Sequence, residues 1–384
     1  MTIKIKSFLQ KEVEISSILD AIIDHDKFVS KSIDDNLLKT FNLDAIKFSN
    51  AIKTQLEIFK SLNVDIINLY NSIPKFLRED YVAEVKEKIF NLLDQLNSND
   101  YLKTYCNQHE LFTRIKSYSC DINAINAFLL LEKSEVLKKN LLEFKDHKSF
   151  KYTRTNTTTG RLSVLSFPNI LTLPRKYRSI FKTQFEKGKI FYIDFVSLEP
   201  RVMRKIGGSD CEIDIYEEIK NNFEIDLDRS VIKQAVIARA YGSSKESLYK
   251  KISKEKVDNL FDMLSQYLHI DKCLESAQNN TAENCRLNFW HRPIWNIKVE
   301  EENVILNNFI QSTAVDVALT GFANIVKLLD KNKVKPLFLI HDALMIDVEE
   351  SYIPEFVNIS RQGYNCNKLG YFPISIEDLN GTKY

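Results

Sequence analysis

Two aspartates stand next to apolar segments, in positions where chemistry on a phosphate can be organised. Asp194 directly follows the apolar run 190–193, and Asp342 lies between the apolar runs 337–340 and 343–346. Each aspartate taken singly also fits a simple turn-forming role. Together the two carboxylates suit hard divalent cations, because Mg²⁺ binds one or two carboxylates along with substrate phosphates. Two such ions would stabilise the attacking and leaving oxygens of an in-line phosphoryl displacement.

A row of four side chains at four-residue spacing is the second candidate feature. In a helix such positions follow one face, and an aspartate before the row and a glycine after it are typical of helix ends. Two cations at the start of a helix do not complement its positive end, so they favour binding of an anion such as a triphosphate. A solvated basic face is the alternative interpretation. The row consists of Arg229, Lys233, Ile237 and Tyr241.

The elements that must position these residues follow from the apolar pattern. Residues 1–145 are predicted to be helical, with few strand signals. Further helices are expected within 228–268 and over 300–330. The run before Asp194 predicts a buried strand, and the runs around Asp342 predict a hairpin. The whole pattern indicates an α+β fold that is predominantly helical.

Composition narrows the function classes. The 384 residues carry a net charge of only +1, yet residues 145–189 hold eleven basic residues and two acids, a local charge of +9. Such a local basic surface attracts polyanions whatever the total charge. Six cysteines without a CxxC pair indicate reduced thiols. The sequence has no run of roughly 18 apolar residues and no recognisable signal peptide. We therefore expect an intracellular, cytoplasmic protein that does not associate with membranes.

Five segments of the chain occur in the order of one known set of motifs. They are Thr159-Gly160-Arg161-Leu162-Ser163 with Pro168-Asn169 and Leu173-Pro174, then Asp194-Phe-Val-Ser-Leu-Glu199-Pro-Arg201, then Arg229-x3-Lys233-x7-Tyr241-Gly242, then Phe309-Ile310-Gln311-Ser312-Thr313-Ala314-Val315-Asp316, and Ile340-His341-Asp342. This series resembles the motifs of A-family DNA polymerases, the group that includes bacterial DNA polymerase I. It spans roughly residues 151–349. Any one segment alone would be a weak indication.

The resemblance implies a right-hand polymerase fold with an antiparallel palm sheet, helical fingers and a helical thumb. Residues 1–145 are then expected to form a helical extension with a reduced thumb, 146–204 the first part of the palm, 205–295 the fingers and 296–384 the second part of the palm. No proofreading exonuclease domain is expected ahead of the matched region. This arrangement is similar to compact viral or mobile-element enzymes, which act in the host cytoplasm when viral.

The resemblance also assigns roles at the reacting phosphates. Asp194 and Asp342 would bind two Mg²⁺ ions, with Mn²⁺ as a substitute and the backbone carbonyl of Phe195 as a further ligand. Arg229 and Lys233 would hold the incoming deoxynucleoside triphosphate, and Lys233 would give a proton to the leaving pyrophosphate. Positioning and charge neutralisation of this kind catalyse phosphoryl transfer.

Other roles implied by the resemblance concern the sugar and the DNA. Glu199 would pack with Tyr241 beneath the sugar and exclude a ribose 2′-hydroxyl, with Ile237 also at the nucleotide. Arg161 and Gln311 would donate to minor-groove acceptors that all correct base pairs share.

Two further residues complete the DNA contacts that the resemblance implies. His341 would contact the primer terminus, and Arg201 is the remaining residue expected at the DNA. The expected partners are primer-template DNA, deoxynucleoside triphosphates and accessory replication proteins.

Four positions depart from the family pattern. Ala343 stands where a second acid is usual, so metal binding rests more heavily on Asp342. Ile237 replaces an aromatic residue, Ala238 replaces a glycine, and Pro200 replaces an apolar residue in a place that is tolerable if it opens a helix. Two alternatives stay open: a polymerase with an RNA template or ribonucleotide preference, and a degenerate nucleic-acid-binding module.

Overall fold

The computed structural model describes residues 2–4, 21–24, 27–30, 49–61, 74–80, 83–84, 87 and 100–384, except for 116, 147–148, 155, 166–167, 243–244, 283–284 and 295–300. The chain falls into two units, Met1–Glu110 and Leu111–Tyr384. The division lies within helix α6 (Asp100–Arg114), ahead of the boundary at residue 145 that the sequence predicted. The candidate site lies in the second unit.

The first unit is not helical throughout, which corrects the prediction for residues 1–145. Strands β1 (Thr2–Lys4), β2 (Ala21–Asp24) and β3 (Lys27–Ser30) form an antiparallel sheet in the order β1-β2-β3. Each strand has only three or four residues, too few to give a recognisable alternation of apolar and polar side chains. Helix α3 (Asn50–Ser61) and the short 3₁₀ helix η1 (Lys75–Leu77) agree with the prediction.

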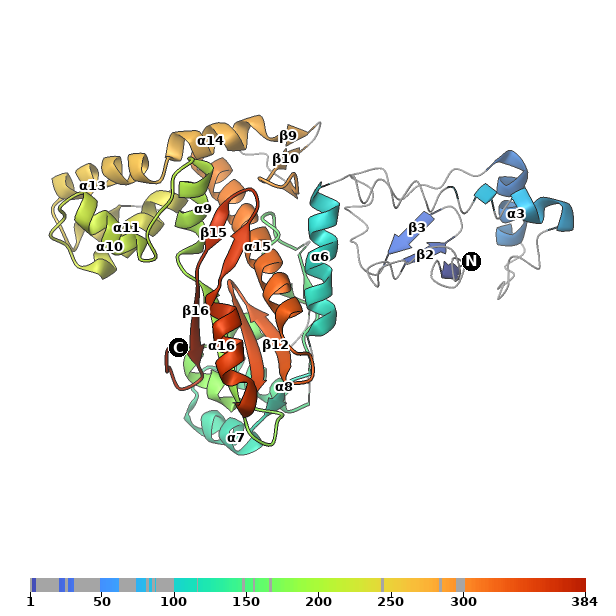
Figure 1. The fold of residues 1–384 in the computed structure, drawn as a ribbon, viewed down its shortest axis with the longest axis horizontal. Coiled ribbons are helices and arrows are strands. Elements are labelled where there is room, and N and C mark those ends of the chain that lie inside the picture. Colours follow the sequence, from blue (N-terminus) through green and yellow to red (C-terminus); the bar gives the residue numbers. More distant parts are fainter. Residues whose placement is uncertain are drawn as a thin grey trace. The chain divides into compact units, whose positions relative to one another are not determined.

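A four-stranded antiparallel sheet is the centre of the second unit. It has the order β12-β13-β8-β16, from strands β12 (Val334–Ile340), β13 (Ala343–Glu349), β8 (Gly188–Phe195) and β16 (Ile374–Asp378). The strand expected before Asp194 and the hairpin expected around Asp342 are both present. Figure 1 shows this sheet at the centre of the unit, with α15 (Glu302–Leu328) and α16 (Ile353–Arg361) beside it.

Alternation along β8 assigns its side chains to two faces. Ile190 and Tyr192 belong to an aromatic-rich cluster on one face. Phe191 and Phe195 point to the other face, where their ring centroids lie 5.0 Å from those of Phe356 on α16 and Phe322 on α15, respectively. Asp194 continues the row of Ile190 and Tyr192, so its carboxylate emerges on the cluster face where the apolar cover ends.

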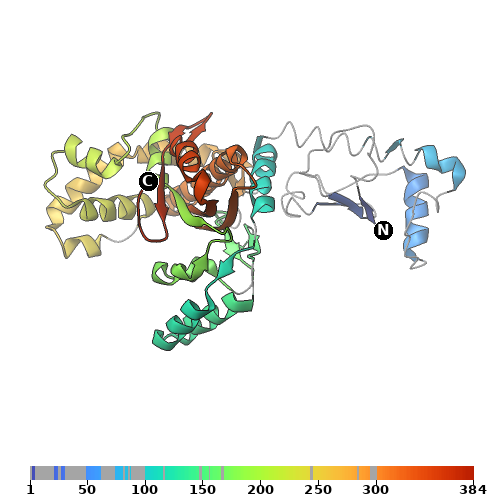
Figure 2. The same cartoon turned by 60° about the horizontal axis from the view of Figure 1, so that its bottom comes forward.

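The cluster face is covered by α7 (Ile122–Leu131), α8 (Glu135–Asp146) and the 3₁₀ helix η3 (Arg175–Ile180). Figure 2 shows α7 and α8 side by side in teal, apart from the helical lobe. The Tyr118 ring packs against several aromatic rings of this cluster. Its centroid lies 4.9 Å from that of Phe150 and 5.4 Å from that of Phe181. Aromatic burial of this kind contributes strongly to a core.

The opposite face is covered by the long helix α15, as the sequence predicted for residues 300–330. By length and composition α15 could cross a membrane, but 83% of its most apolar window is buried inside the protein. At Gly321 a Cβ atom would lie 2.6 Å from the ring of Phe195. The missing side chain therefore lets α15 pack directly on the end of β8, next to Asp194.

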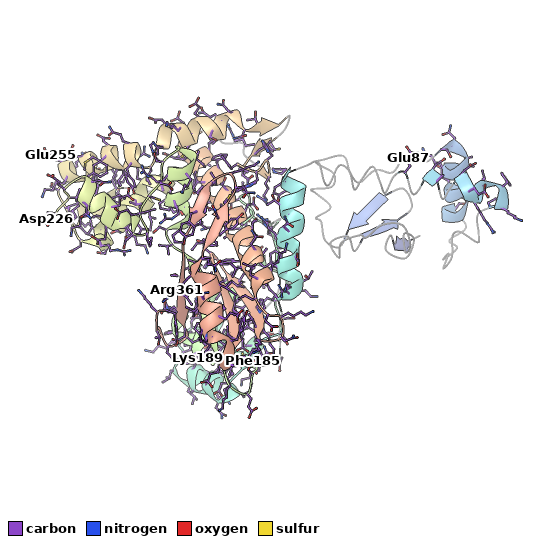
Figure 3. All side chains as sticks on the ribbon, viewed as in Figure 1. Glu87, Phe185, Lys189, Asp226, Glu255 and Arg361 are labelled. Carbon is purple, nitrogen blue, oxygen red and sulfur yellow. The ribbon has the colours of Figure 1, made fainter. Side chains whose placement is uncertain are left out.

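A helical lobe extends from the sheet beyond α9 (Leu198–Ile206), as Figure 1 shows. Its members are α10 (Ile215–Asn222), α11 (Arg229–Tyr241), α12 (Glu246–Tyr249), α13 (Lys254–Tyr267) and α14 (Ile270–Asn279). Figure 3 marks Asp226 and Glu255 at the outer part of this lobe, and Lys189 at the start of β8. Pro200 lies in the first turn of α9, as expected for a proline that opens a helix.

The remaining described elements are short connections around this framework. They are β4 (Ser119–Cys120), β5 (Tyr152–Thr153), β6 (Ser163–Val164), η2 (Ile170–Thr172), β7 (Phe181–Lys182), β9 (Thr281–Ala282), β10 (Cys285–Leu287), β11 (Pro293–Ile294), η4 (Glu350–Tyr352), β14 (Tyr364–Cys366) and β15 (Gly370–Phe372).

Candidate active site

The two predicted aspartates meet at one end of the central sheet. Asp194 of β8 is the register partner of Ala343, the first residue of β13, and Asp342 immediately precedes that residue. Both aspartates line one pocket, together with His341 and with Ser375 of β16. Long-range strand pairing therefore brings together two carboxylates that lie far apart in the sequence.

Both carboxylates have raised pKa values. Although the Asp194 side chain is partly exposed to solvent, the surrounding protein disfavours its charged form, and this burial, followed by the negative charge of Glu199, raises its pKa to about 6. Asp342 is half-buried, and burial, then Glu199, with a contribution from Asp194, raises its pKa to about 7. Burial and the charge of Glu199 therefore disfavour the ionised form of both carboxylates, and a positive counterion would stabilise it.

Ala343 limits the negative charge at this point. It lies directly opposite Asp194 in the antiparallel pair, where two acids would be close like charges. Ala343 is 9% exposed and packs into the aromatic-rich cluster. Alanine at this position, where a second acid is usual, therefore packs in the core and cannot bind a metal. Asp342 is then the carboxylate available in the turn between β12 and β13.

The donor set fits divalent ions that take further ligands from a substrate. Among the described residues no group of three or more His, Cys, Asp or Glu side chains is arranged to hold a metal. Two carboxylates and the carbonyl of Phe195 form the available set at the end of β8, and hard cations such as Mg²⁺ commonly complete their shell with phosphate oxygens and water. Asp194, Asp342 and Phe195 are thus the residues that would hold such ions.

Glu199 and Tyr241 lie together, as the sequence predicted. The Tyr241 hydroxyl forms a hydrogen bond with Glu199, and burial followed by the charge of Glu199 raises the pKa of Tyr241. Arg161 approaches the same carboxylate at 3.4 Å, with its side chain 42% exposed against 14% for Glu199. Glu199 is therefore held from two sides next to the aspartate pair.

Three of the four residues in the predicted row on α11 form a solvent-facing stripe, and the fourth, Tyr241, is half-buried against Glu199. Arg229, Lys233 and Ile237 are exposed, whereas Val231, Ile232, Ala235 and Val236 on the opposite side are buried. The charge of Lys233 is close enough to lower the pKa of Asp194 against the effect of burial. Gly242 ends the helix with a φ of 64°, the left-handed conformation expected at a helix C-terminus.

Arg161 and Gln311 are attached to a buried polar network. The Arg154 guanidinium donates to Asp316 at 2.7 Å and to the carbonyl of Gly160 at 2.9 Å, and the Arg154 and Asp316 side chains are 7% and 0% exposed. Because Gly160 precedes Arg161 and Asp316 lies on the helix that carries Gln311, this ion pair connects the two predicted DNA contacts. Removing one partner of such a pair would leave a buried charge.

Arg292 closes the same network above Gly160. Its guanidinium donates to Ser312 at 3.2 Å, and Asn288 donates to Asp316 at 2.6 Å. Gly160 has a φ of 68°, and a Cβ atom there would lie 2.1 Å from the Arg292 guanidinium. The glycine of this motif is therefore required both by its backbone conformation and by the arginine packed on it.

The pocket is also lined by His341 and by four residues that the sequence analysis did not assign to the site, Arg175, Arg178, Tyr192 and Glu377. His341 is exposed, with a φ of 51°, and partial burial followed by the charges of Arg161 and Arg178 lowers its pKa. Arg175 and Arg178 lie over the Tyr192 ring at 5.7 Å and 5.6 Å, and Arg175 pairs with Glu377. The only sequence signal for the two arginines was their place in the basic segment 145–189.

Arg201 is a correction to the predicted DNA contacts. Its side chain is 2% exposed, and its guanidinium donates to the carbonyls of Glu212 at 2.9 Å and Ile213 at 3.0 Å. Further bonds reach Val196 and Cys211. Arg201 on α9 therefore binds the loop that precedes α10, and its N–H donors are not available to DNA.

Comparisons with known proteins agree with this geometry. A family model described as DNA polymerase family A matches residues 99–375. Among solved structures, the POL domain of Pol1 from M. smegmatis, in complex with DNA primer-template and dNTP, is similar with a TM-score of 0.57 and 15% identity. The match covers 90% of this chain and 81% of that one, and it supports the α+β polymerase fold. The comparison with curated proteins found no significant match.

Replacement of Asp342 by asparagine is expected to stabilise the metal-free protein. The folded pKa of about 7 exceeds the ordinary 3.8, so the stability of the fold decreases as pH rises through this interval and stays low above it. Asp342→Asn should raise the unfolding free energy by roughly 1 kcal/mol or more near pH 8, after allowance for partial exposure, and by less near pH 5. Thermal melting with a chelator measures both values.

The exposed Asp226→Asn provides the control for this comparison, with little expected change at either pH. A melting temperature of Asp342→Asn that is lower than wild type near pH 8 would contradict the destabilising effect of the ionised Asp342 carboxylate.

Proposed function

The chain belongs to DNA polymerase family A and is a template-directed DNA polymerase, and we propose that two divalent metal ions, held at Asp194 and Asp342, carry its chemistry. The observation that supports this proposal most directly is the pairing of β8 with β13, which places both carboxylates in one pocket. Mg²⁺ is the expected ion and Mn²⁺ a substitute. Bound metal ions would stabilise the attacking and leaving oxygens of the displacement.

The chain's own residues supply the charges that a triphosphate needs. Arg229 and Lys233 lie on the solvent-facing stripe of α11, and Lys233 acts on Asp194 through its charge. We assign both to the phosphates of the incoming deoxynucleotide. Lys233, as an ammonium group next to the leaving pyrophosphate, would donate the proton that this group gains.

Glu199 is proposed as the residue that selects the sugar. It is held between Tyr241 and Arg161 beside the aspartate pair, and it has little exposed surface. A side chain so fixed leaves no space for a 2′-hydroxyl, and a deoxynucleotide avoids the conflict. This arrangement favours deoxynucleotide synthesis over the alternative of ribonucleotide preference.

Arg161, Gln311 and His341 are proposed to contact the primer-template. The buried Arg154–Asp316 network connects the segments that carry Arg161 and Gln311, so both side chains would contact the minor groove as one unit. Those minor-groove acceptors are shared by all correct base pairs, so the contacts would test pair geometry without reading sequence.

The alternative of a degenerate binding module predicts DNA binding without synthesis. Asp194, Asp342, Arg229, Lys233 and Tyr241 are all present in the expected elements, which favours an active enzyme. Primer extension with either Mg²⁺ or Mn²⁺ and with DNA or RNA templates separates these alternatives. Binding without any incorporation under all four conditions would favour the module.

Asn replacement of either metal-binding aspartate should abolish most primer extension. Loss of several kcal/mol of charge stabilisation lowers the rate by about a thousandfold. Asp194→Asn and Asp342→Asn are therefore compared with wild type in single-turnover incorporation with Mg²⁺. Asp226→Asn, on the exposed part of the helical lobe, should retain the wild-type rate; full activity of Asp342→Asn would refute the metal assignment.

Shortening Glu199 should relax sugar selection. Glu199→Ala opens the space beneath the sugar, so the ratio of ribonucleotide to deoxynucleotide incorporation should rise on the order of tenfold to a hundredfold. Glu199→Gln keeps the size of the side chain and removes its charge, so it should retain most of the selectivity. Competition of the two nucleotides at one template position measures the ratio; an unchanged ratio in Glu199→Ala is incompatible with a steric role.

A further inference from the structure

Tyr216, in the first turn of α10, has two cations at its ring. The Arg229 guanidinium lies 4.9 Å from the ring centroid, and the Lys233 ammonium lies 5.9 Å from it. Tyr216 is 5% exposed, so its ring is fixed within the lobe. These are the two cations assigned above to the triphosphate, and neither the motifs nor the spacing of α11 pointed to a shared aromatic partner.

Asp214, the N-cap residue of α10, provides a second contact that restrains the Arg229 guanidinium. Nε of Arg229 donates to Oδ2 of Asp214 at 2.9 Å, and Nη2 lies 2.8 Å from the same oxygen in an ion pair. The same side chain accepts from the backbone amides of Tyr216 and Glu217 at 3.0 Å and 3.3 Å. One aspartate therefore both begins α10 and sets the orientation of the guanidinium.

Tyr216 also connects this group to the metal-binding segment. Its hydroxyl forms a hydrogen bond with Ser197, the residue that precedes α9 with a φ of 53°. Ser197 lies three residues after Asp194 in the segment that contains Glu199. Tyr216 thus contacts both the cations of α11 and the segment that follows Asp194.

We propose that Asp214 and Tyr216 are positioning residues that hold Arg229 and Lys233 ready for the triphosphate of the incoming nucleotide. This inference rests on the triphosphate role proposed above for the two cations. An aromatic face attracts a cation without occupying its N–H donors, which stay available for phosphate oxygens. The Asp214 carboxylate lies at the Nε edge of the Arg229 guanidinium. The opposite edge stays available for phosphate, because Nη1 has no hydrogen-bond partner among the described residues.

Restraint of this kind lowers the entropic cost of binding. A free arginine or lysine loses much rotamer freedom when it binds phosphate, and a side chain that is already held loses less. The ion pair of Arg229 with Asp214 is itself weak, because the two side chains are 49% and 39% exposed. A triphosphate can therefore draw the guanidinium forward without a large opposing energy.

Removal of the ring should weaken nucleotide binding specifically. Tyr216→Leu loses two cation–ring contacts, so KM for the deoxynucleotide should rise roughly fivefold to tenfold. The inhibition constant of inorganic pyrophosphate should rise in parallel, because pyrophosphate engages the same cations without base or sugar. Tyr216→Phe keeps the ring and loses the bond to Ser197, so both constants should stay within about twofold of wild type.

Asp214→Asn tests the second restraint. Asparagine is also a good helix N-cap, so α10 should persist while the charge that holds Arg229 is lost. KM should rise about twofold to threefold, in keeping with an exposed ion pair. A KM that is unchanged or lower would overturn the positioning role of Asp214.

Two control measurements distinguish positioning from a loss of folding. A misfolded fraction lowers the rate per mole of protein but leaves KM of the folded fraction unchanged, so active sites are titrated and primer-template affinity is measured in each variant. An unchanged nucleotide KM and pyrophosphate constant in Tyr216→Leu would overturn the inference even if the rate falls. If Tyr216→Leu does not fold, a rise of KM by roughly fivefold or more in Tyr216→Phe, which keeps the ring, would overturn the role of the ring.

Arg229→Ala and Lys233→Ala separate the inference from the function on which it depends. If neither affects nucleotide KM, the triphosphate assignment itself fails. If both raise KM while Tyr216→Leu does not, the cations bind phosphate without the help of α10, and only the present inference is overturned.

Discussion

The placement of Asp194 and Asp342 at one end of the sheet, where burial and the charge of Glu199 disfavour both ionised carboxylates, is the constraint on which the rest of the site depends. Two carboxylates whose charged forms are disfavoured stay together only because β8 and β13 are paired along their whole length, from Glu349 opposite Gly188 to Ala343 opposite Asp194. The aromatic cluster on one face and α15 on the other hold that pairing. The stability of the sheet thus maintains an unfavourable charge arrangement that a bound cation would stabilise.

Positive charges from the helical lobe and from the segment before β8 partly offset this unfavourable negative charge. Lys233 lowers the pKa of Asp194, and Arg161 does so for Asp342, so cations from separate segments converge on the carboxylates. None of these cations forms a close pair with either aspartate among the described residues. Each is instead restrained by another group, as Arg161 is by Glu199, which leaves space at the carboxylates for metal and phosphate.

The sequence predicted the site better than its surroundings. Strand β8, the β12-β13 hairpin and the stripe on α11 have strong local patterns, and the motifs marked their functional residues. The short strands of the first unit and the burial of Arg201 were missed, because a three-residue strand has no periodicity and burial depends on distant partners. Asp214 and Tyr216 were missed for the latter reason: their importance comes from the side chains of α11 that pack against them.

The basic segment 145–189 shows why charge along a sequence is an incomplete guide to binding. Arg154 is buried against Asp316, Arg175 pairs with Glu377, and Lys182 pairs with Asp121 at 2.9 Å. Much of the local +9 is therefore matched by acids from elsewhere in the fold. Exposed cations nevertheless remain in the segment, among them Lys151, Lys176 and Lys187. Its capacity to attract a polyanion therefore rests on these residues together with Arg161, whose side chain is 42% exposed.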